Sequence, residues 1–161
     1  MIINRLHYQD GNTHHISGDI DFSKDVFDGF LIRKIKSCHV ELNVTDYDEI
    51  FRVEINLKAE VVTPCSYTLE DVDFVVKTKD EIDFTDSPLD ESEDDGTLIY
   101  IDGVLIDLKP FVYSLIVTSI PPKVVKKGAK LPTGVITSDE YEKQLEDKAD
   151  PRWSMLDDLD L

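Results

Sequence analysis

The chain is poor in the residues that most often carry catalytic or metal chemistry. Only two Cys and seven Gly occur among its 161 residues, which argues against a disulfide scaffold. It has no Gly-rich phosphate loop and no His-Glu-x-x-His motif, so the sequence predicts neither a nucleotide cradle nor a metalloprotease helix. An apolar run of about 18 residues and an N-terminal secretory signal are also lacking. We therefore expect a cytoplasmic protein that is not an enzyme and uses no cofactor.

Basic side chains are scarce as well. The 17 Lys and Arg residues face 34 Asp and Glu residues, which gives a formal net charge of −17. Such a charge repels phosphate at long range and attracts basic partners. Proteins that bind RNA over a wide surface instead neutralise phosphates with Lys and Arg. The charge favours a protein partner and restricts any RNA contact to a local basic patch.

The clearest structural pattern is a strict alternation of apolar and polar residues from Phe51 to Val61. This period is typical of a strand with one face on a core and one face in water. A second alternating run extends from Cys38 to Val44, and the Asp-rich segment between the two runs favours a turn. A third run covers 72–77, and residues 15–22 suggest an edge strand. Together these runs predict an antiparallel meander.

Residues 80–95 contain nine carboxylates and no Lys or Arg. Like charges in such a run repel one another, so we expect a solvated loop. The run is also a candidate mimic of nucleic acid that binds a basic protein. It lacks the Gly and distal Glu of a calcium loop. A short strand is expected after it, at residues 98–101.

One helix is predicted from Asp107 to Ser119. Its apolar residues fall on one stripe at positions 108, 111, 112, 115 and 116, Asp107 is a good N-cap, and Pro110 lies in the first turn, where Pro is tolerated. We expect an α+β domain at residues 1–121, with either an open antiparallel sheet of five or six strands or a partial barrel. Residues 122–161 are predicted to form a flexible linker and a C-terminal helical arm.

Three short motifs occur in order over about the last hundred residues. They are residues 63–69 (TPCSYTL), residues 106–121, which begin with IDLKP, and residues 150–159, which begin with DPR. In order and spacing, and with an acidic loop between the first two, they resemble the YceD-like family of large ribosomal RNA subunit accumulation proteins. The resemblance implies a role in the synthesis, processing or stability of large-subunit (23S) ribosomal RNA, and no enzymatic activity.

The sequence departs from that family's zinc-binding pattern. Many relatives carry a Cys pair around the first motif and further Cys residues before the tail, whereas Thr68 stands here at the place of the second Cys and residues 122–150 contain none. The resemblance is therefore to a zinc-free, Gram-positive-type branch, and no metal site is expected. His14 and His15 would point to opposite faces of a strand, so they cannot easily share one ion.

Two segments are the candidate contact sites. The C-terminal arm places one Trp and two Leu on one face of a short helix, which suits docking into a groove of a ribosome-biogenesis or ribosomal protein. The alternative is that this helix packs on the chain's own sheet. The predicted partner-binding residues are Asp150, Pro151, Arg152, Trp153, Leu156 and Leu159. The predicted RNA-contact residues are Lys123, Lys126, Lys127 and Lys130.

The sequence thus favours a non-catalytic adaptor in large-subunit biogenesis that binds mainly through protein contacts. The alternative function is an acidic regulatory protein that mimics nucleic acid and competes for a basic partner. The sequence also predicts how far each of the two cysteines is exposed to solvent. Cys38 should pack in the core, and Cys65 should be more accessible at a strand end.

Overall fold

The computed structural model describes residues 1–25, 27, 31–87, 98–131 and 134. The chain divides into two compact units, Met1–Lys126 and Lys127–Leu161, and most described residues belong to the first. Val124 is buried in the core of this first unit, although it lies beyond the boundary predicted after residue 121. All structural elements discussed below lie within the first unit.

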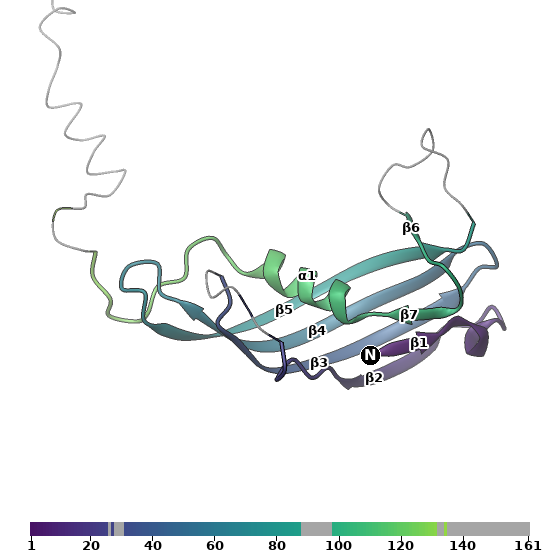
Figure 1. Cartoon of the computed structure of the whole chain (residues 1–161), viewed down its shortest axis with the longest axis horizontal. Coiled ribbons are helices and arrows are strands. Elements are labelled where there is room, and N and C mark those ends of the chain that lie inside the picture. Colours follow the sequence, from purple (N-terminus) through teal and green to yellow (C-terminus); the bar gives the residue numbers. More distant parts are fainter. Residues whose placement is uncertain (26, 28–30, 88–97, 132–133, 135–161) are drawn as a thin grey trace, which may run out of the picture. The chain divides into compact units, whose positions relative to one another are not determined.

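A five-stranded sheet forms the body of this unit (Figure 1). Its order follows the sequence, β2-β3-β4-β5-β6, and every neighbouring pair is antiparallel except β5 and β6, which are parallel. The sheet is open, so the predicted partial barrel is wrong, and so is a purely antiparallel sheet. The strands are β2 (His14–Asp19), β3 (Lys34–Asp46), β4 (Phe51–Pro64), β5 (Asp71–Thr85) and β6 (Leu98–Tyr100).

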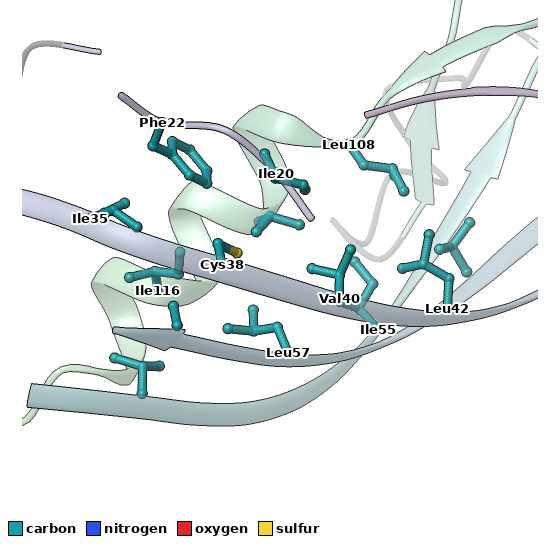
Figure 2. Packing of buried hydrophobic residues seen from close by; sticks show 14 of the residues in the cluster. Ile20, Phe22, Ile35, Cys38, Val40, Leu42, Ile55, Leu57, Leu108 and Ile116 are labelled. Carbon is teal, nitrogen blue, oxygen red and sulfur yellow. The ribbon is translucent and has the colours of Figure 1, made fainter. Parts of the chain in front are cut away.

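The predicted hairpin of β3 and β4 is confirmed, with Leu42 directly opposite Ile55. Alternate residues of both strands face the core, because successive side chains of a strand point to opposite sides. Val40, Leu42 and Ile55 are at most 2% exposed, and Cys38 packs among them as predicted. Figure 2 shows these side chains with Ile116 of the helix. The alternating pattern therefore identified the buried residues of β3 and β4 correctly.

The helix α1 (Lys109–Ser119) lies across one face of the sheet (Figure 1). Leu108, Val112 and Ile116 are fully buried, which confirms the predicted apolar stripe. The predicted N-cap at Asp107 is wrong, because Leu108 holds that position and Lys109 is the first helical residue. The Asp107 carboxylate, one residue earlier, still accepts a hydrogen bond from the Lys109 N–H (3.0 Å). Pro110 lies in the first turn, where its missing N–H costs nothing.

A small second sheet was not predicted. The strand β1 (Ile2–Asn4) pairs antiparallel with β7 (Leu105–Asp107), and the Leu108 N–H donates to the Met1 carbonyl (2.9 Å). Strands of three residues are too short to show an alternating pattern. This pairing places the N-terminus next to the start of α1.

A buried ion pair follows β1. Arg5, in the 3₁₀ helix η1 (Arg5–Tyr8), donates through Nε and Nη2 to the two carboxylate oxygens of Asp46 at the end of β3 (3.0 and 2.9 Å). Both side chains are only 4% exposed. Arg5 Nη2 also donates to the Asp48 carbonyl, and Nη1 lies 3.2 Å from the exposed carboxylate of Asp86. One guanidinium thus joins the N-terminal segment to the ends of β3 and β5.

The acidic run does not form a loop over its whole length. Strand β5 continues to Thr85, so Asp80, Glu81 and Asp83 are strand residues and the loop prediction is wrong for them. Arg52 explains why this strand end is stable, since it donates two hydrogen bonds to Asp83 (both 2.8 Å) and lies 3.2 Å from Glu81. Cross-strand pairing supplies the positive charge that the sequence window lacked. Residues 88–97 of the run lie outside the described residues.

The described residues contain no helix that is long and apolar enough to cross a membrane.

Candidate functional site

Two of the three motifs that carry the family resemblance lie side by side. The loop 65–70 follows β4, and the segment 120–126 follows α1. The Ser66 N–H donates to the Val124 carbonyl (2.7 Å), and the Val124 N–H donates back to the Ser66 hydroxyl oxygen (3.1 Å). We call this pair of segments the motif junction. Its reciprocal hydrogen bonds fix the two segments in one register.

Cys65 stands at the centre of the motif junction. It is fully buried, so the prediction of an accessible thiol is wrong. The loop turns back over the strand end, because the Cys65 N–H donates to Glu70 and the Cys65 carbonyl accepts from Leu69 (2.8 and 2.9 Å). The signal for this turn was not visible in the sequence, since Tyr67-Thr68-Leu69 contains none of the usual turn residues.

Hydrogen-bond donors surround the sulfur of Cys65. The backbone N–H of Lys126 lies 3.3 Å from Sγ. This donor, followed by the Thr68 side chain, lowers the pKa of the thiol to about 7, because hydrogen bonds to a thiolate stabilise its charge. The backbone of the junction thus polarises the one sulfur that the first motif retains.

The donor set at Cys65 does not fit a structural zinc ion. Such an ion takes four Cys or His ligands, whereas segments 65–70 and 120–126 contain one Cys, no His and one carboxylate, that of Glu70. Among residues 1–25, 27, 31–87, 98–131 and 134, no group of three His, Cys, Asp or Glu side chains is placed to hold a metal.

Leu69 is held in a strained and exposed position. Its φ angle is +58°, a left-handed conformation that costs about 1–2 kcal/mol for a residue with a Cβ atom. The Leu69 side chain is 68% exposed, while its carbonyl accepts a hydrogen bond from Arg33 Nη2 (2.8 Å). Backbone strain of this kind is concentrated at functional sites. The left-handed conformation of Leu69 therefore lowers the stability of the fold, and the residue that adopts it has an apolar side chain exposed to solvent.

Leu69 borders a small apolar hollow of about 170 Å³. Small-molecule sites usually enclose about 300–1,000 Å³, so this hollow is better suited to a side chain of a protein partner. Its apolar lining comes from both segments of the junction and from the chain before β3. The lining residues include Leu31, Pro64, Leu69, Ile120, Pro121 and Pro122.

Two of the four predicted RNA-contact lysines lie on the motif junction. The Lys123 ammonium lies 4.8 Å from the centre of the Tyr67 ring, a cation–π contact. Lys126 Nζ lies 3.0 Å from a Glu70 carboxylate oxygen, so part of its charge is neutralised within the chain. Lys127 and Lys130 are exposed residues of the second compact unit. RNA contact by these lysines stays a prediction.

The predicted partner-binding arm lies outside the described residues. Asp150, Pro151, Arg152, Trp153, Leu156 and Leu159 therefore stay a sequence prediction. Leu69 and Tyr67 are the site residues that the sequence did not reveal. Tyr67 was visible within the first motif, but only its contact with Lys123 shows that it faces the segment that follows the second motif.

Comparison with known proteins gave one finding. The family model described as large ribosomal RNA subunit accumulation protein YceD matches residues 53–160, a range that includes both segments of the motif junction. Searches of the curated proteins and of the solved structures found no match.

Proposed function

Because this chain belongs to the YceD family of large ribosomal RNA subunit accumulation proteins, we propose that it is a non-catalytic accessory factor that acts by binding a protein partner. The family match carries this proposal. It covers about two thirds of the chain and ties the chain to the accumulation of large-subunit ribosomal RNA. Placement in a zinc-free, Gram-positive-type branch is part of the proposal.

The motif junction is the surface that we assign to the partner. Leu69 is strained and exposed there, and the adjoining hollow is apolar and of side-chain size. An exposed apolar side chain beside an apolar hollow is the kind of surface feature that marks a protein–protein contact. The net charge of −17 favours a basic protein, such as a ribosomal or ribosome-biogenesis protein, in the cytoplasm.

The C-terminal arm supplies a second, linear contact in this proposal. Its Trp153, Leu156 and Leu159 would share one face of a short helix, which suits a groove on the same partner. Two linked contacts strengthen binding because the second becomes intramolecular once the first has formed.

Contact with ribosomal RNA is a lesser part of the proposal. Lys123 stays available beside Tyr67, whereas Lys126 shares its charge with Glu70. If these lysines neutralise phosphates, RNA binding must weaken as salt rises, because counterion release scales with the number of phosphates neutralised. RNA binding that is independent of salt would remove this part.

The test is depletion of the protein followed by gradient sedimentation of ribosomal particles. We expect the ratio of large to small subunits to fall, and the wild-type chain to restore it. A normal ratio after depletion would refute the proposed role.

A variant of the motif junction sharpens the test. Leu69→Gly removes the exposed side chain and relieves the left-handed strain, while the entropy of Gly costs about 0.5–1 kcal/mol. The variant should therefore be at least as stable as the wild type, yet restore the subunit ratio poorly. Full restoration would show that the Leu69 surface is not the partner site, without affecting the family-level role.

A further inference from the structure

The outer edge of β5 is largely open. Strand β4 pairs with β5 from Asp71 to Phe84, but β6 pairs only with residues 83–85 on the other side. Among the residues that the structure describes, 71–82 have no strand beside them on that side (Figure 1). A long edge with unpaired N–H and C=O groups is a template for another strand.

The solvent-facing residues of this edge are complementary to themselves. Asp71, Asp73, Val75, Lys77 and Lys79 alternate on one face and are all exposed. When two copies of β5 pair antiparallel about Val75, Asp73 lies opposite the partner's Lys77 and Asp71 lies opposite the partner's Lys79. The 48% exposed Val75 then meets its own symmetry mate. Opposite charges and apolar pairs at such positions stabilise a sheet.

The other face of the edge is complementary in the same register. Phe74 lies opposite the partner's Val76, and Val72 opposite the partner's Thr78. Val72 and Phe74 are only partly buried against the core, so a neighbouring strand would bury more of their apolar surface. One residue beyond this range, Glu70 would face the partner's Asp80, and this repulsion ends the pairing at residues 71–79.

Among the described residues, no carboxylate pairs with the two lysines of the edge. Lys77 lies directly opposite Lys58 of β4, and like charges in that position are destabilising. Within the described part of the chain, no carboxylate forms a salt bridge with Lys77 or Lys79, whereas Arg33 pairs with Asp71 and Lys36 with Asp73 (2.5 Å for the second pair). The carboxylates of Asp71 and Asp73 stay 62% and 73% exposed, so they remain accessible to a second cation.

We propose that β5 binds β5 of a second copy of this chain and joins two five-stranded sheets into one. The contact is isologous, so each copy contributes the same residues about a two-fold axis. It covers residues 71–79 of the open edge in both copies and leaves only residues 80–82 of that edge unpaired. The paired residues 71–79 begin directly after Glu70, the last residue of loop 65–70 in the motif junction, and the dimer is proposed independently of the ribosomal role.

The first test is the oligomeric state of the full-length chain in sedimentation equilibrium over a range of concentrations. The wild type should form a dimer. In the double variant Lys77→Glu/Lys79→Glu, four ion pairs of the dimer become repulsive, and the dissociation constant should rise at least about tenfold. The control Lys24→Glu reverses one exposed charge outside strands β3, β4 and β5 and should leave the dimer unchanged, and Lys77→Glu alone is its equal-charge counterpart.

Charge complementation then tests the partner surface. Asp71→Lys/Asp73→Lys has an all-basic edge and should be a monomer, but a mixture with Lys77→Glu/Lys79→Glu should form a heterodimer. Circular dichroism on each variant shows whether it folds. Folded variants that stay monomeric when mixed would overturn the pairing of these charges.

A cysteine substitution tests the register. Directly opposed residues in antiparallel strands have Cα atoms about 4.5–5.5 Å apart, which is within reach of a disulfide. Val75→Cys should therefore crosslink to itself under mild oxidation, while Lys79→Cys should not. The native Cys38 and Cys65 are buried and give little background. Two results would overturn the proposal: a wild-type chain that stays monomeric, or a dimer that fails to crosslink through position 75. In a monomer, Lys77 and Lys79 would be charges that keep the edge unpaired.

Discussion

At the scale of single residues, the two cysteines titrate in opposite directions because their neighbours differ. Burial in the apolar core raises the pKa of Cys38 to about 11, since a thiolate there would lose its hydration. Cys65 is equally inaccessible to solvent, but N–H and hydroxyl donors around its sulfur lower its pKa to about 7. Burial alone therefore does not determine the chemistry of a thiol, and the hydrogen-bond donors decide it.

Cys65 should make the stability of the fold depend on pH. Its ordinary pKa is 9.0 and its folded pKa is about 7, so between these values the folded chain has released a proton that the unfolded chain still holds. The free energy of unfolding should therefore rise with pH in that window, and the gain should be lost as the pH falls through 7. Urea unfolding at a series of pH values measures this slope.

The control for this prediction is Cys65→Ser, which keeps a hydrogen-bonding side chain but does not titrate in that range. The difference between the two pH profiles isolates the thiol from every other group. Identical slopes for the wild type and Cys65→Ser would contradict the lowered pKa. Ultraviolet absorbance of the thiolate gives an independent titration of the same group.

Arg5 is a second residue whose role follows from its contacts. A buried ion pair that loses one partner leaves an uncompensated charge, which typically costs about 3–5 kcal/mol. The neighbouring Asp86 is 58% exposed, so solvent screens part of the site. We expect Arg5→Ala to lower the free energy of unfolding by about 3 kcal/mol, measured by urea unfolding.

Asp86→Asn is the matched control for Arg5→Ala. It removes the exposed partner of the same guanidinium and leaves the buried Asp46 in place, so its cost should be about 1 kcal/mol or less. An equal decrease in the free energy of unfolding for the two variants would show that the buried Arg5–Asp46 pair contributes no more than the exposed Arg5–Asp86 pair. Nothing in the local sequence around Arg5 marks it as buried, because its partners lie 41 and 81 residues further along the chain.

At the scale of elements, those whose apolar pattern repeats over many residues were predictable from the sequence. Short strands and strand ends that depend on contacts with a neighbouring strand were not. The alternation in β4 and the stripe in α1 each extend over about ten residues, and both gave the correct element and the correct buried face. The end of β5 was missed because its charges are balanced by Arg52 of the neighbouring strand. The β1–β7 pair depends on two three-residue segments that only tertiary structure brings together. At the motif junction, the sequence marked the two motifs but not the turn that buries Cys65.

The stripe of α1 leads to a prediction about packing. Ile116 is fully buried and lies among core residues from the sheet (Figure 2). Ile116→Ala should lower the free energy of unfolding by about 2–5 kcal/mol, because it removes buried methyl groups and leaves a cavity. Thermal or urea unfolding provides the measurement. The exposed Ser114 lies on the opposite side of the same helix, and Ser114→Ala should change stability by less than about 0.5 kcal/mol.

At the scale of the whole molecule, the acidic run 80–95 and the proposed binding surface at the motif junction are different parts of the chain. Three of the nine carboxylates in the run 80–95 are strand residues, two of them paired with Arg52, and Asp86 lies beside Arg5. Mimicry of nucleic acid would therefore depend on the rest of the run. The motif junction is one of the exposed apolar sites of the first compact unit, and it lies within the family match, which covers residues 53–160. This arrangement favours the adaptor function over the mimic.

Two deletions distinguish these functions. Removing residues 150–161 deletes the predicted arm with Trp153, while removing residues 88–97 deletes five carboxylates of the acidic run. If the chain is an adaptor with two linked contacts, loss of the arm should weaken retention of the partner by about 10²-fold or more, because the effective concentration gained from linkage disappears. Loss of 88–97 should change retention little and mainly alter its salt dependence. Co-purification from ribosomal fractions at two salt concentrations measures both effects. The Leu69→Gly chain is tested alongside the two deletions, because it weakens the contact at the motif junction. A mimic would give the reverse order, since removal of the charges would then abolish binding and removal of the arm would leave it intact.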